Sequence, residues 1–243
     1  MIRTTRTRAS TAPPISRIPK QDRSRASFER VLEAAAELMA EKGYAGFALT
    51  DVVKRAKVSI GSIYGRVDSK DELIRAVHQR VMSRLELEQA EMFLRVRRRA
   101  LPLSELLSAL IQEMAGFLQR NAPVLNAFMG RAFDDEVVMS FGKLAYSHTL
   151  TEFKMLLIER GSEIAKPQVE HSAQVCFDII YSCLSRYFGV GRLPGNEDRG
   201  DLQLLVADLS NVCLAYLSSS REMRGPKSGR RQRSVARRGP GVG

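Results

Sequence analysis

Ten residues between positions 50 and 70 have the side chains, or the small size, that contacts with DNA require. Their hydroxyl and cationic groups can donate hydrogen bonds to phosphates and to base edges. Isoleucine can touch a thymine methyl group, and glycine lets a helix lie close to the groove floor. We expect these residues to form one DNA-binding surface: Thr50, Lys57, Ser59, Ile60, Gly61, Ser62, Tyr64, Gly65, Arg66 and Lys70.

Apolar residues in the same segment are spaced to bury one side of a compact pair of short helices. They are Leu49, Val52, Val53, Ala56, Val58, Ile63 and Val67. A buried side of this kind, opposite a side rich in hydroxyls and cations, is the layout of a helix-turn-helix DNA reader. The segment therefore predicts two short helices joined by a tight turn, followed by the start of a third helix.

The flanking residues predict where the neighbouring helices begin and end. Ser24 or Ser27 can cap a first helix, which should end at Gly43 in a left-handed conformation with Tyr44 packing back. Ser59 is expected to cap the recognition helix. Ser69 with Glu72 three residues later forms a capping box for a long helix that runs to about Arg99.

The rest of the chain also has helical periodicity, so we expect an all-α protein of about nine helices. After the long helix the predicted segments are 103–120, 124–130, 135–161, 168–188 and 201–217, with a break at Asn121-Ala-Pro123. Four regions follow: a disordered basic arm (1–23), a helix-turn-helix domain (24–72), a larger helical domain (73–220) and a disordered basic tail (221–243).

The net charge of +11 lies in the two ends of the 243-residue chain. Residues 1–25 hold seven Arg or Lys against one Asp, and residues 221–243 hold eight against one Glu, which leaves the body at −2. Such ends can attract phosphates without sequence preference, or they can serve only as solubilising segments. The arginines of the arm could also enter a minor groove.

Several classes of function lack their signatures. The P-loop, H-E-x-x-H and G-x-S-x-G motifs are absent, and the three histidines are isolated, so we expect neither an enzyme nor a bound metal or cofactor. The three cysteines lie in apolar runs, as reduced core residues do. Neither a secretory signal nor a membrane span is predicted. These features favour a cytoplasmic, DNA-associated protein.

The stretch from Arg30 to Leu73 resembles the DNA-binding domain of the TetR (tetracycline-repressor-like) family of bacterial transcriptional regulators. The matching residues are Val31-Leu32-x-Ala34-Ala35, Gly43-Tyr44, Asp51-Val52-x-x-x-Ala56, Val58-Ser59-x-Gly61-Ser62-Ile63-Tyr64 and Ser69-Lys70-x-x-Leu73. Lys57 replaces the small turn residue that is usual in the family, so we expect it to adopt the left-handed conformation. Phe47-Ala48 replaces a usual Thr pair, so we expect Thr50 to cap the second helix.

The resemblance implies a ligand-responsive dimer. A single short helix-turn-helix covers only a few base pairs, so useful specificity requires two copies on a palindromic operator. The resemblance places the dimer interface on the last two long helices, at Val175, Ile179, Leu184, Leu205, Leu209 and Leu217, although the same stripe would suit an intramolecular core. It also implies a pocket for a small, apolar effector among residues that could equally be core: Met114, Phe117, Phe128, Met129, Phe133, Phe141, His148, Phe177 and Tyr181, with Gln112 as a further polar point.

The function predicted from these observations is a repressor that a small molecule releases from its operator. The alternatives are a ligand-independent protein that coats DNA through its basic ends, and an orphan helical enzyme. A discrete palindromic footprint with about 10³-fold preference over random DNA would separate the regulator from the coating protein.

Overall fold

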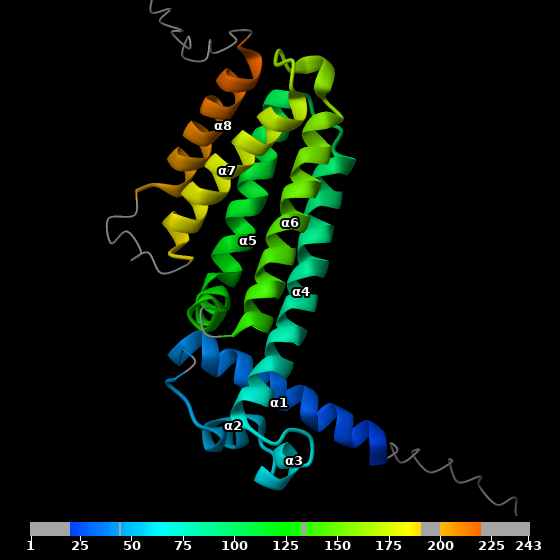
Figure 1. Ribbon diagram of the computed structural model, residues 1–243, viewed down its shortest axis with the longest axis vertical. Coiled ribbons are helices and arrows are strands. Elements are labelled where there is room, and N and C mark those ends of the chain that lie inside the picture. The colour runs from blue at the N-terminus through cyan, green and yellow to red at the C-terminus, as the bar shows by residue number, and fades with distance from the viewer. Residues whose placement is uncertain (1–19, 44, 133–134, 191–199, 220–243) are drawn as a thin grey trace, which may run out of the picture.

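The computed structural model describes residues 20–43, 45–132, 135–190 and 200–219. Throughout these residues the chain is helical, with eight α-helices and one short 3₁₀ helix. Three helices, α1 (Lys20–Lys42), α2 (Leu49–Ala56) and α3 (Ile60–Tyr64), form a head at one end of the molecule (Figure 1). The predicted arm and tail, together with Tyr44 and Phe133, lie largely or wholly outside the described residues.

The head has its own apolar centre, which follows from the predicted spacing of apolar residues. Ala35 and Met39 of α1, Val52 of α2 and Ile63 of α3 have no exposed surface. Burying Ile63 matters most for α3, because a helix of five residues has too few internal hydrogen bonds to persist alone. Packing against the rest of the head therefore stabilises α3, its shortest helix.

Helix α4 (Lys70–Arg98) begins in the head and continues through the length of the body (Figure 1). Its start is capped by the Ser69 hydroxyl, which accepts a hydrogen bond from the Glu72 amide at 3.1 Å. The Glu72 carboxylate accepts in turn from the amide of Asp68 at 2.7 Å, one residue earlier than the capping box predicts. Arg80 ties α4 to α1 through ion pairs with Glu29 and Glu33.

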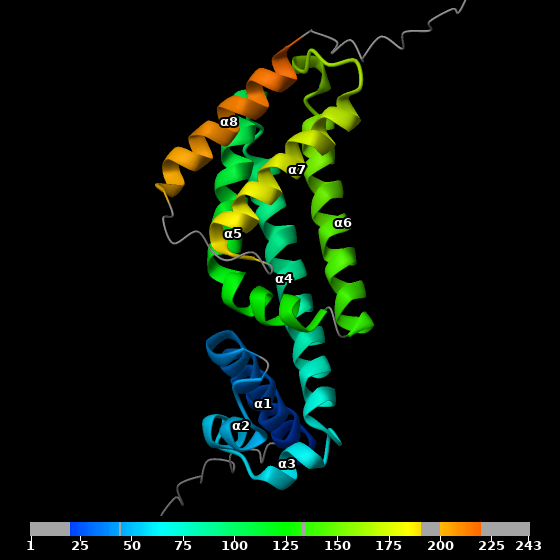
Figure 2. The ribbon, with the colours of Figure 1, turned by 60° about the vertical axis from the view of Figure 1, so that its left-hand side comes forward.

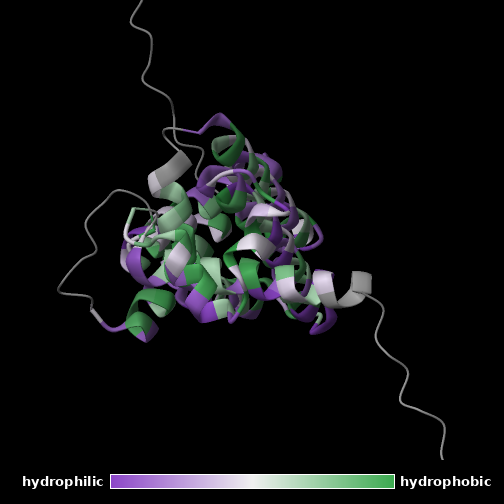
Figure 3. Cartoon of the chain, turned by 90° about the horizontal axis from the view of Figure 1, so that it is seen from below, coloured by the Kyte–Doolittle hydropathy of each residue, from purple (hydrophilic) through white to green (hydrophobic). Residues whose placement is uncertain are grey.

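The body is a helical bundle built around α4. Helices α5 (Leu103–Ala132) and α6 (Glu136–Ile158) run beside it, α7 (Val169–Phe188) crosses them obliquely, and α8 (Leu202–Ser218) covers α5 (Figures 1 and 2). The 3₁₀ helix Gly161–Glu163 joins α6 to α7. Seen from below, the helices carry both hydrophilic and hydrophobic segments, as expected of amphipathic helices (Figure 3).

The predicted break at Asn121-Ala-Pro123 is wrong, because α5 continues through Pro123. Proline removes one backbone hydrogen bond and kinks a helix, and α5 turns sharply near its lower end in Figure 2. Buried Ala122, Val124 and Phe128 carry the apolar face past this point, so packing holds both sides of the bend. We call residues 124–132 the lower limb of α5; two predicted helices thus become one.

A polar network fastens the bend to α4. The buried Asn121 amide donates to the Phe117 carbonyl and to the Glu88 carboxylate, each at 3.0 Å. Arg120 also donates to Glu88, at 2.7 and 2.9 Å, and Arg84 donates to the Asn121 carbonyl oxygen at 3.3 Å. These bonds satisfy a buried amide and fix the direction in which the lower limb leaves.

Two helix starts also differ from the sequence prediction. Helix α1 begins at Lys20, so Ser24 and Ser27 lie inside it rather than at its cap. Helix α2 begins at Leu49 with Ala48 as its N-cap, so Thr50 lies in the first turn and does not cap. The Asp51 carboxylate replaces it by accepting a hydrogen bond from the Ala48 amide at 2.9 Å. None of the described helices has the length and apolar character needed to cross a membrane.

Candidate nucleic-acid interface and ligand cavity

The turn between α2 and α3 has the predicted geometry. Lys57 adopts the left-handed conformation, with φ 54° and ψ 50°, in a place where glycine is the usual residue. The Ser59 side chain caps α3 by accepting a hydrogen bond from the Ser62 amide at 3.3 Å, as the sequence predicts. This local geometry sets the direction of α3 relative to α2.

The residues predicted to bind DNA belong to α2, α3, the turn between them and the segment that leads into the first residue of α4. Tyr64 is 52% exposed and Ile60 is 43% exposed, so both side chains are accessible to another molecule. Lys70 is half-buried, and the other members of the set are exposed. Nearly all of the groups predicted to meet phosphates and bases are thus accessible on the head.

Gly61 sits at the centre of this surface with open space around it. A Cβ built on Gly61 would approach no protein atom outside the local helix closer than 4.0 Å, and that atom is the Ser59 Oγ. Nothing within the described protein therefore requires glycine there. A small residue on an exposed helix face is consistent with close approach to another molecule.

Arg66 and Lys70 already have partners inside the head. The Arg66 guanidinium donates to the Ser24 Oγ at 2.8 Å and lies 5.0 Å from the centre of the Phe28 ring. The Lys70 ammonium donates to the Phe47 carbonyl at 2.6 Å and lies 4.3 Å from the Phe47 ring. In this structure both cations join segments of the head, so any contact with DNA would add to or replace these bonds.

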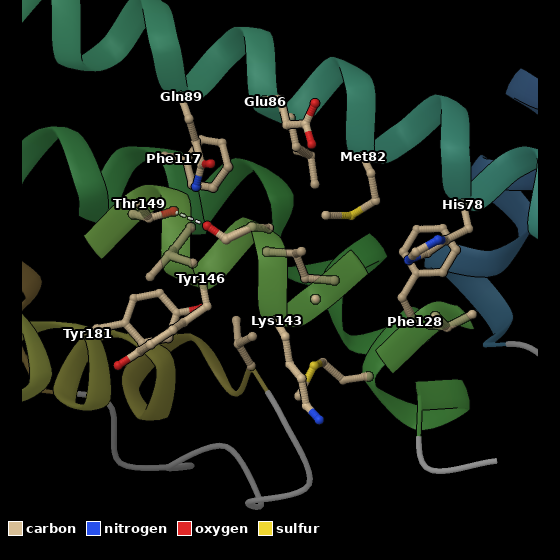
Figure 4. Close-up of a pocket in the computed structure, with 18 of the residues that line it drawn as sticks. His78, Met82, Glu86, Gln89, Phe117, Phe128, Lys143, Tyr146, Thr149 and Tyr181 are labelled. Carbon is tan, nitrogen blue, oxygen red and sulfur yellow. Dashed lines mark hydrogen bonds between the residues drawn. The ribbon is translucent and has the colours of Figure 1, made fainter. Parts of the chain in front are cut away.

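A cavity of about 370 Å³ lies in the body between α4, α5, α6 and the end of α7. Figure 4 shows its wall, with Gln89, Met82 and His78 in a row along α4 and Phe117 and Phe128 facing them from α5. The wall also includes Glu86 and Lys143, which are exposed. The remaining lining is mostly apolar, as in binding sites for small organic molecules.

Five of the nine residues proposed for an effector pocket line this cavity: Met114, Phe117, Phe128, Met129 and Tyr181. Three do not. Phe141 packs outside against the His78 ring at 5.3 Å, His148 is exposed, and Phe177 is fully buried in the core, where its ring stacks on Tyr181 at 5.4 Å. The ninth, Phe133, lies outside the described residues, and Gln112 is exposed away from the wall.

The polar groups of the cavity were missed by the sequence interpretation. His78 and Gln89 are 2% and 8% exposed on α4, at positions that continue its apolar stripe. Burial lowers the pKa of His78 to about 4, against a smaller raising effect of the Asp135 carboxylate, so the imidazole is neutral at pH 7. The sequence does contain an indication of these two residues, because a histidine and a glutamine occupy positions of the helix where the pattern calls for apolar side chains.

Two tyrosines border the same cavity. The Tyr146 hydroxyl donates to the Asp178 carboxylate at 2.9 Å. Desolvation, with this carboxylate as a second cause, raises the pKa of Tyr146 to about 12. Burial also raises the pKa of Tyr181. Both tyrosines are therefore neutral at physiological pH.

The outer side of α7 and α8 carries apolar residues that no described helix covers. Leu204 is 61% exposed and Val212 is 54% exposed, eight residues apart on α8. Val175, Ile179 and Leu205, from the predicted interface, are half-buried on the same two helices. The other three predicted residues, Leu184, Leu209 and Leu217, are 0%, 6% and 0% exposed, so they are core positions of the single chain.

The chemistry of other groups is limited. In the described part of the chain, no cluster of three or more His, Cys, Asp or Glu side chains is arranged to hold a metal ion. Cys176 and Cys213 are buried, Cys183 is half-buried, and all three are free thiols. The head, the cavity and the uncovered apolar side of α7 and α8 are the features that need a functional explanation.

The comparisons with known proteins agree with the head and with the overall fold. Residues 31–77 match the sequence profile of the family described as bacterial regulatory proteins, tetR family. The head is therefore similar to the DNA-binding domain of TetR-family regulators.

Individual relatives match mainly over short segments. The chain is 31% identical over 70 residues to the A-factor receptor protein of Streptomyces griseus, and 33% identical over 66 residues to the HTH-type transcriptional regulator YvdT of Bacillus subtilis. These matches cover 29% and 27% of this chain, and they span 25% and 33% of the two relatives.

Solved structures match over most of the described chain. A protein named as a TetR-family transcriptional regulator from Mesorhizobium loti superposes with a TM-score of 0.62, covering 81% of this chain and 97% of the other at 16% identity. A transcriptional regulator from Cytophaga hutchinsonii gives a TM-score of 0.59, covering 80% and 100% at 14% identity. At these identities the likeness establishes the TetR-family fold of the body and leaves its ligand open.

Proposed function

We propose that this protein is a transcriptional repressor that binds a palindromic operator as a dimer and is released by a small molecule held in the cavity of the body. The observation that carries the proposal is the continuity of α4. This single helix of 29 residues starts next to the exposed surface of α3 and also forms one wall of the cavity. A ligand that displaces α4 would therefore also displace the head.

A second connection runs through α5. Leu125, Phe128 and Met129 of the lower limb line the cavity. Helix α5 packs against α1, and the lower limb lies directly above α1 in Figures 1 and 2. The ligand and the head thus share two elements, α4 and the lower limb. If the two positions of the head differ in DNA affinity, ligand and DNA must weaken each other's binding by the same factor.

The exposed side of α7 and α8 supports the dimer. Leu204, Val212 and Ala215 are exposed, and their spacing places them on one face of α8. Val175 and Ile179 are half-buried and four residues apart, so they share one face of α7. Pairing this side with its copy about a twofold axis would place two heads on one duplex. Specific reading of DNA needs two heads, because a five-residue recognition helix reaches only a few base pairs.

Selection of DNA fragments by the purified full chain, followed by footprinting, tests the proposal. We expect a palindromic site whose affinity exceeds that for random DNA by about 10³-fold or more. Tyr64→Phe should weaken binding to all fragments, whereas Tyr187→Phe, which removes a hydroxyl bonded to the Gly200 carbonyl at 2.9 Å in the body, should leave binding unchanged.

Similar affinity for every fragment would contradict the repressor and would indicate a coating protein. A reporter gene placed behind the selected site then tests the direction of regulation. Lower expression in the presence of the protein supports repression, and higher expression contradicts it.

A further inference from the structure

The cavity is elongated along the bundle. Its wall on α4 extends from His78 to Met92, which is about 21 Å of helix at 1.5 Å per residue. On α6 it extends from Val138 to Thr149, about 16 Å. Since α4 and α6 run side by side in both ribbon views, a ligand that fills the space must lie along these helices (Figures 1 and 2).

The two buried polar side chains of α4 lie toward opposite ends of this space. His78 and Gln89 are eleven residues apart, which is three turns and about 16 Å along one face of the helix. Figure 4 shows Gln89 near Phe117 and Thr149, and His78 near Phe128. Each polar group therefore shares its part of the cavity with an aromatic ring.

Neither side chain has a hydrogen-bond partner among the described residues, although both are more than nine-tenths buried. Neither is among the fully enclosed polar side chains of the described residues that have no partner, so their polar atoms retain accessible surface. Near Gln89, the Thr149 hydroxyl donates to the Ala145 carbonyl at 2.8 Å and keeps its acceptor capacity (Figure 4). The cavity thus offers unused hydrogen-bonding capacity in two separate places.

The space between them is apolar and adaptable. Met82 and Leu85 on α4 face Met114, Leu118 and Leu125 on α5. Methionine is unbranched and fits its shape to irregular apolar surfaces. The volume of 370 Å³ is more than twice the roughly 150 Å³ of an apolar cavity that takes benzene, so an extended aliphatic chain has room.

Full charges are confined to exposed positions on the cavity wall. Glu86 and Lys143 are both exposed and have opposite signs, so they impose no net charge on a ligand. The polar groups met in the interior are uncharged, and they include the neutral His78 imidazole, the Gln89 amide and the Thr149 hydroxyl. An ionised ligand group placed against them would lose its hydration without gaining a counter-ion, which is costly.

We propose that the effector is a neutral, elongated molecule with an apolar middle and a hydrogen-bonding group at each end, one bound by Gln89 and the other by His78. This inference rests on the proposed function, because it names the ligand of the cavity that the repressor would use. Gln89 and His78 are then the specificity-determining residues, and the methionines of the wall accommodate the length of the chain.

Titration calorimetry of the full chain with three probes tests this inference. The probes are 1,12-dodecanediol, 1-dodecanol and dodecanedioate, which share a chain length and differ only at their ends. The diol should bind most tightly, and 1-dodecanol should bind about fivefold to tenfold more weakly because one buried hydrogen bond is missing. Dodecanedioate should bind more weakly than either alcohol.

Two variants test whether Gln89 and His78 each bind one end of the diol. Gln89→Leu and His78→Leu should each weaken diol binding by about fivefold to tenfold. Gln112→Leu is the matched control, because Gln112 is an exposed glutamine outside the wall, and it should leave diol binding unchanged. The probe series on the unaltered chain decides the question by itself where a variant does not fold.

Equal affinity for diol and 1-dodecanol, tightest binding of dodecanedioate, or no binding of any probe would each overturn the inference. Diol affinity unchanged in both folded variants would overturn it as well. Fluorescence anisotropy of the selected operator with and without diol tests the proposed function separately. Diol binding that leaves operator affinity unchanged would refute effector release while leaving the ligand assignment standing.

Discussion

Protonation of His78 should destabilise the folded chain below neutral pH. The side chain is 2% exposed, and burial lowers its pKa from 6.5 to about 4. Between these two values the unfolded chain binds a proton at His78 that the folded chain does not bind. Stability therefore falls as the pH decreases through this window, and the contribution is fully present only above pH 6.5.

The size of the effect follows from the shift. Over the whole window the loss is about 3 kcal/mol, and between pH 7 and pH 5 it is about 2 kcal/mol, at 1.36 kcal/mol per pKa unit. This is a large part of the 5–15 kcal/mol typical of domains. Urea unfolding followed by circular dichroism at the two pH values measures it, at one fixed protein concentration because a dimer unfolds in a concentration-dependent way.

His78→Leu provides the control, because it removes the titrating group and keeps the site apolar. Both proteins lose stability at pH 5 as other groups titrate, so the informative quantity is the difference between their losses. We expect the original chain to lose about 2 kcal/mol more than the variant. Equal losses would refute the reasoning, because they would show that His78 takes up its proton at the same pH whether the chain is folded or unfolded.

Three further predictions concern the head and the dimer. Gly61→Ala should raise the free energy of unfolding by about 0.5–1 kcal/mol through higher helix propensity and should weaken operator binding; unchanged affinity in anisotropy titrations would show that no close approach occurs there. Lys57→Gly should stabilise the chain by about 1 kcal/mol in urea unfolding, because φ is 54°; a loss of stability would mean that the turn carries no strain. Leu204→Glu with Val212→Glu should produce monomers in sedimentation velocity, whereas Leu87→Glu on α4, 69% exposed, should not; dimers of the double variant would exclude this face.

The head could be predicted in detail because its signals are local. The left-handed Lys57, the Ser59 cap and the Ser69 cap each depend on residues within one turn of one another. Thr50 shows the limit of this reasoning, because Asp51 supplied a competing hydrogen bond and moved the helix start. The choice between two plausible caps depends on small energy differences that a pattern does not resolve.

The body was predicted less well because its features depend on contacts between distant segments. Proline ordinarily ends a helix, yet Asn121 and Glu88, more than thirty residues apart, stabilise α5 through Pro123. Similarly, apolar stripes do not distinguish a core from a cavity wall or an interface. Phe177 and Phe117 look the same in sequence and both are buried, yet only Phe117 lines the cavity. Leu184 and Ile179 also look the same, yet Leu184 is buried and Ile179 is half-buried once the helices have packed.

The sequence by itself determined an all-helical chain, a helix-turn-helix rich in hydroxyl and cationic side chains, and the resemblance of its N-terminal segment to the TetR family. Only the tertiary structure decided that α4 links this head to a cavity, that His78 and Gln89 are its buried polar groups, and that Arg66 and Lys70 are bonded within the head. The physical reason is the distance along the chain over which each interaction acts. Capping, turn geometry and amphipathic periodicity act within a few residues, whereas a cavity is the space left when whole helices pack against one another.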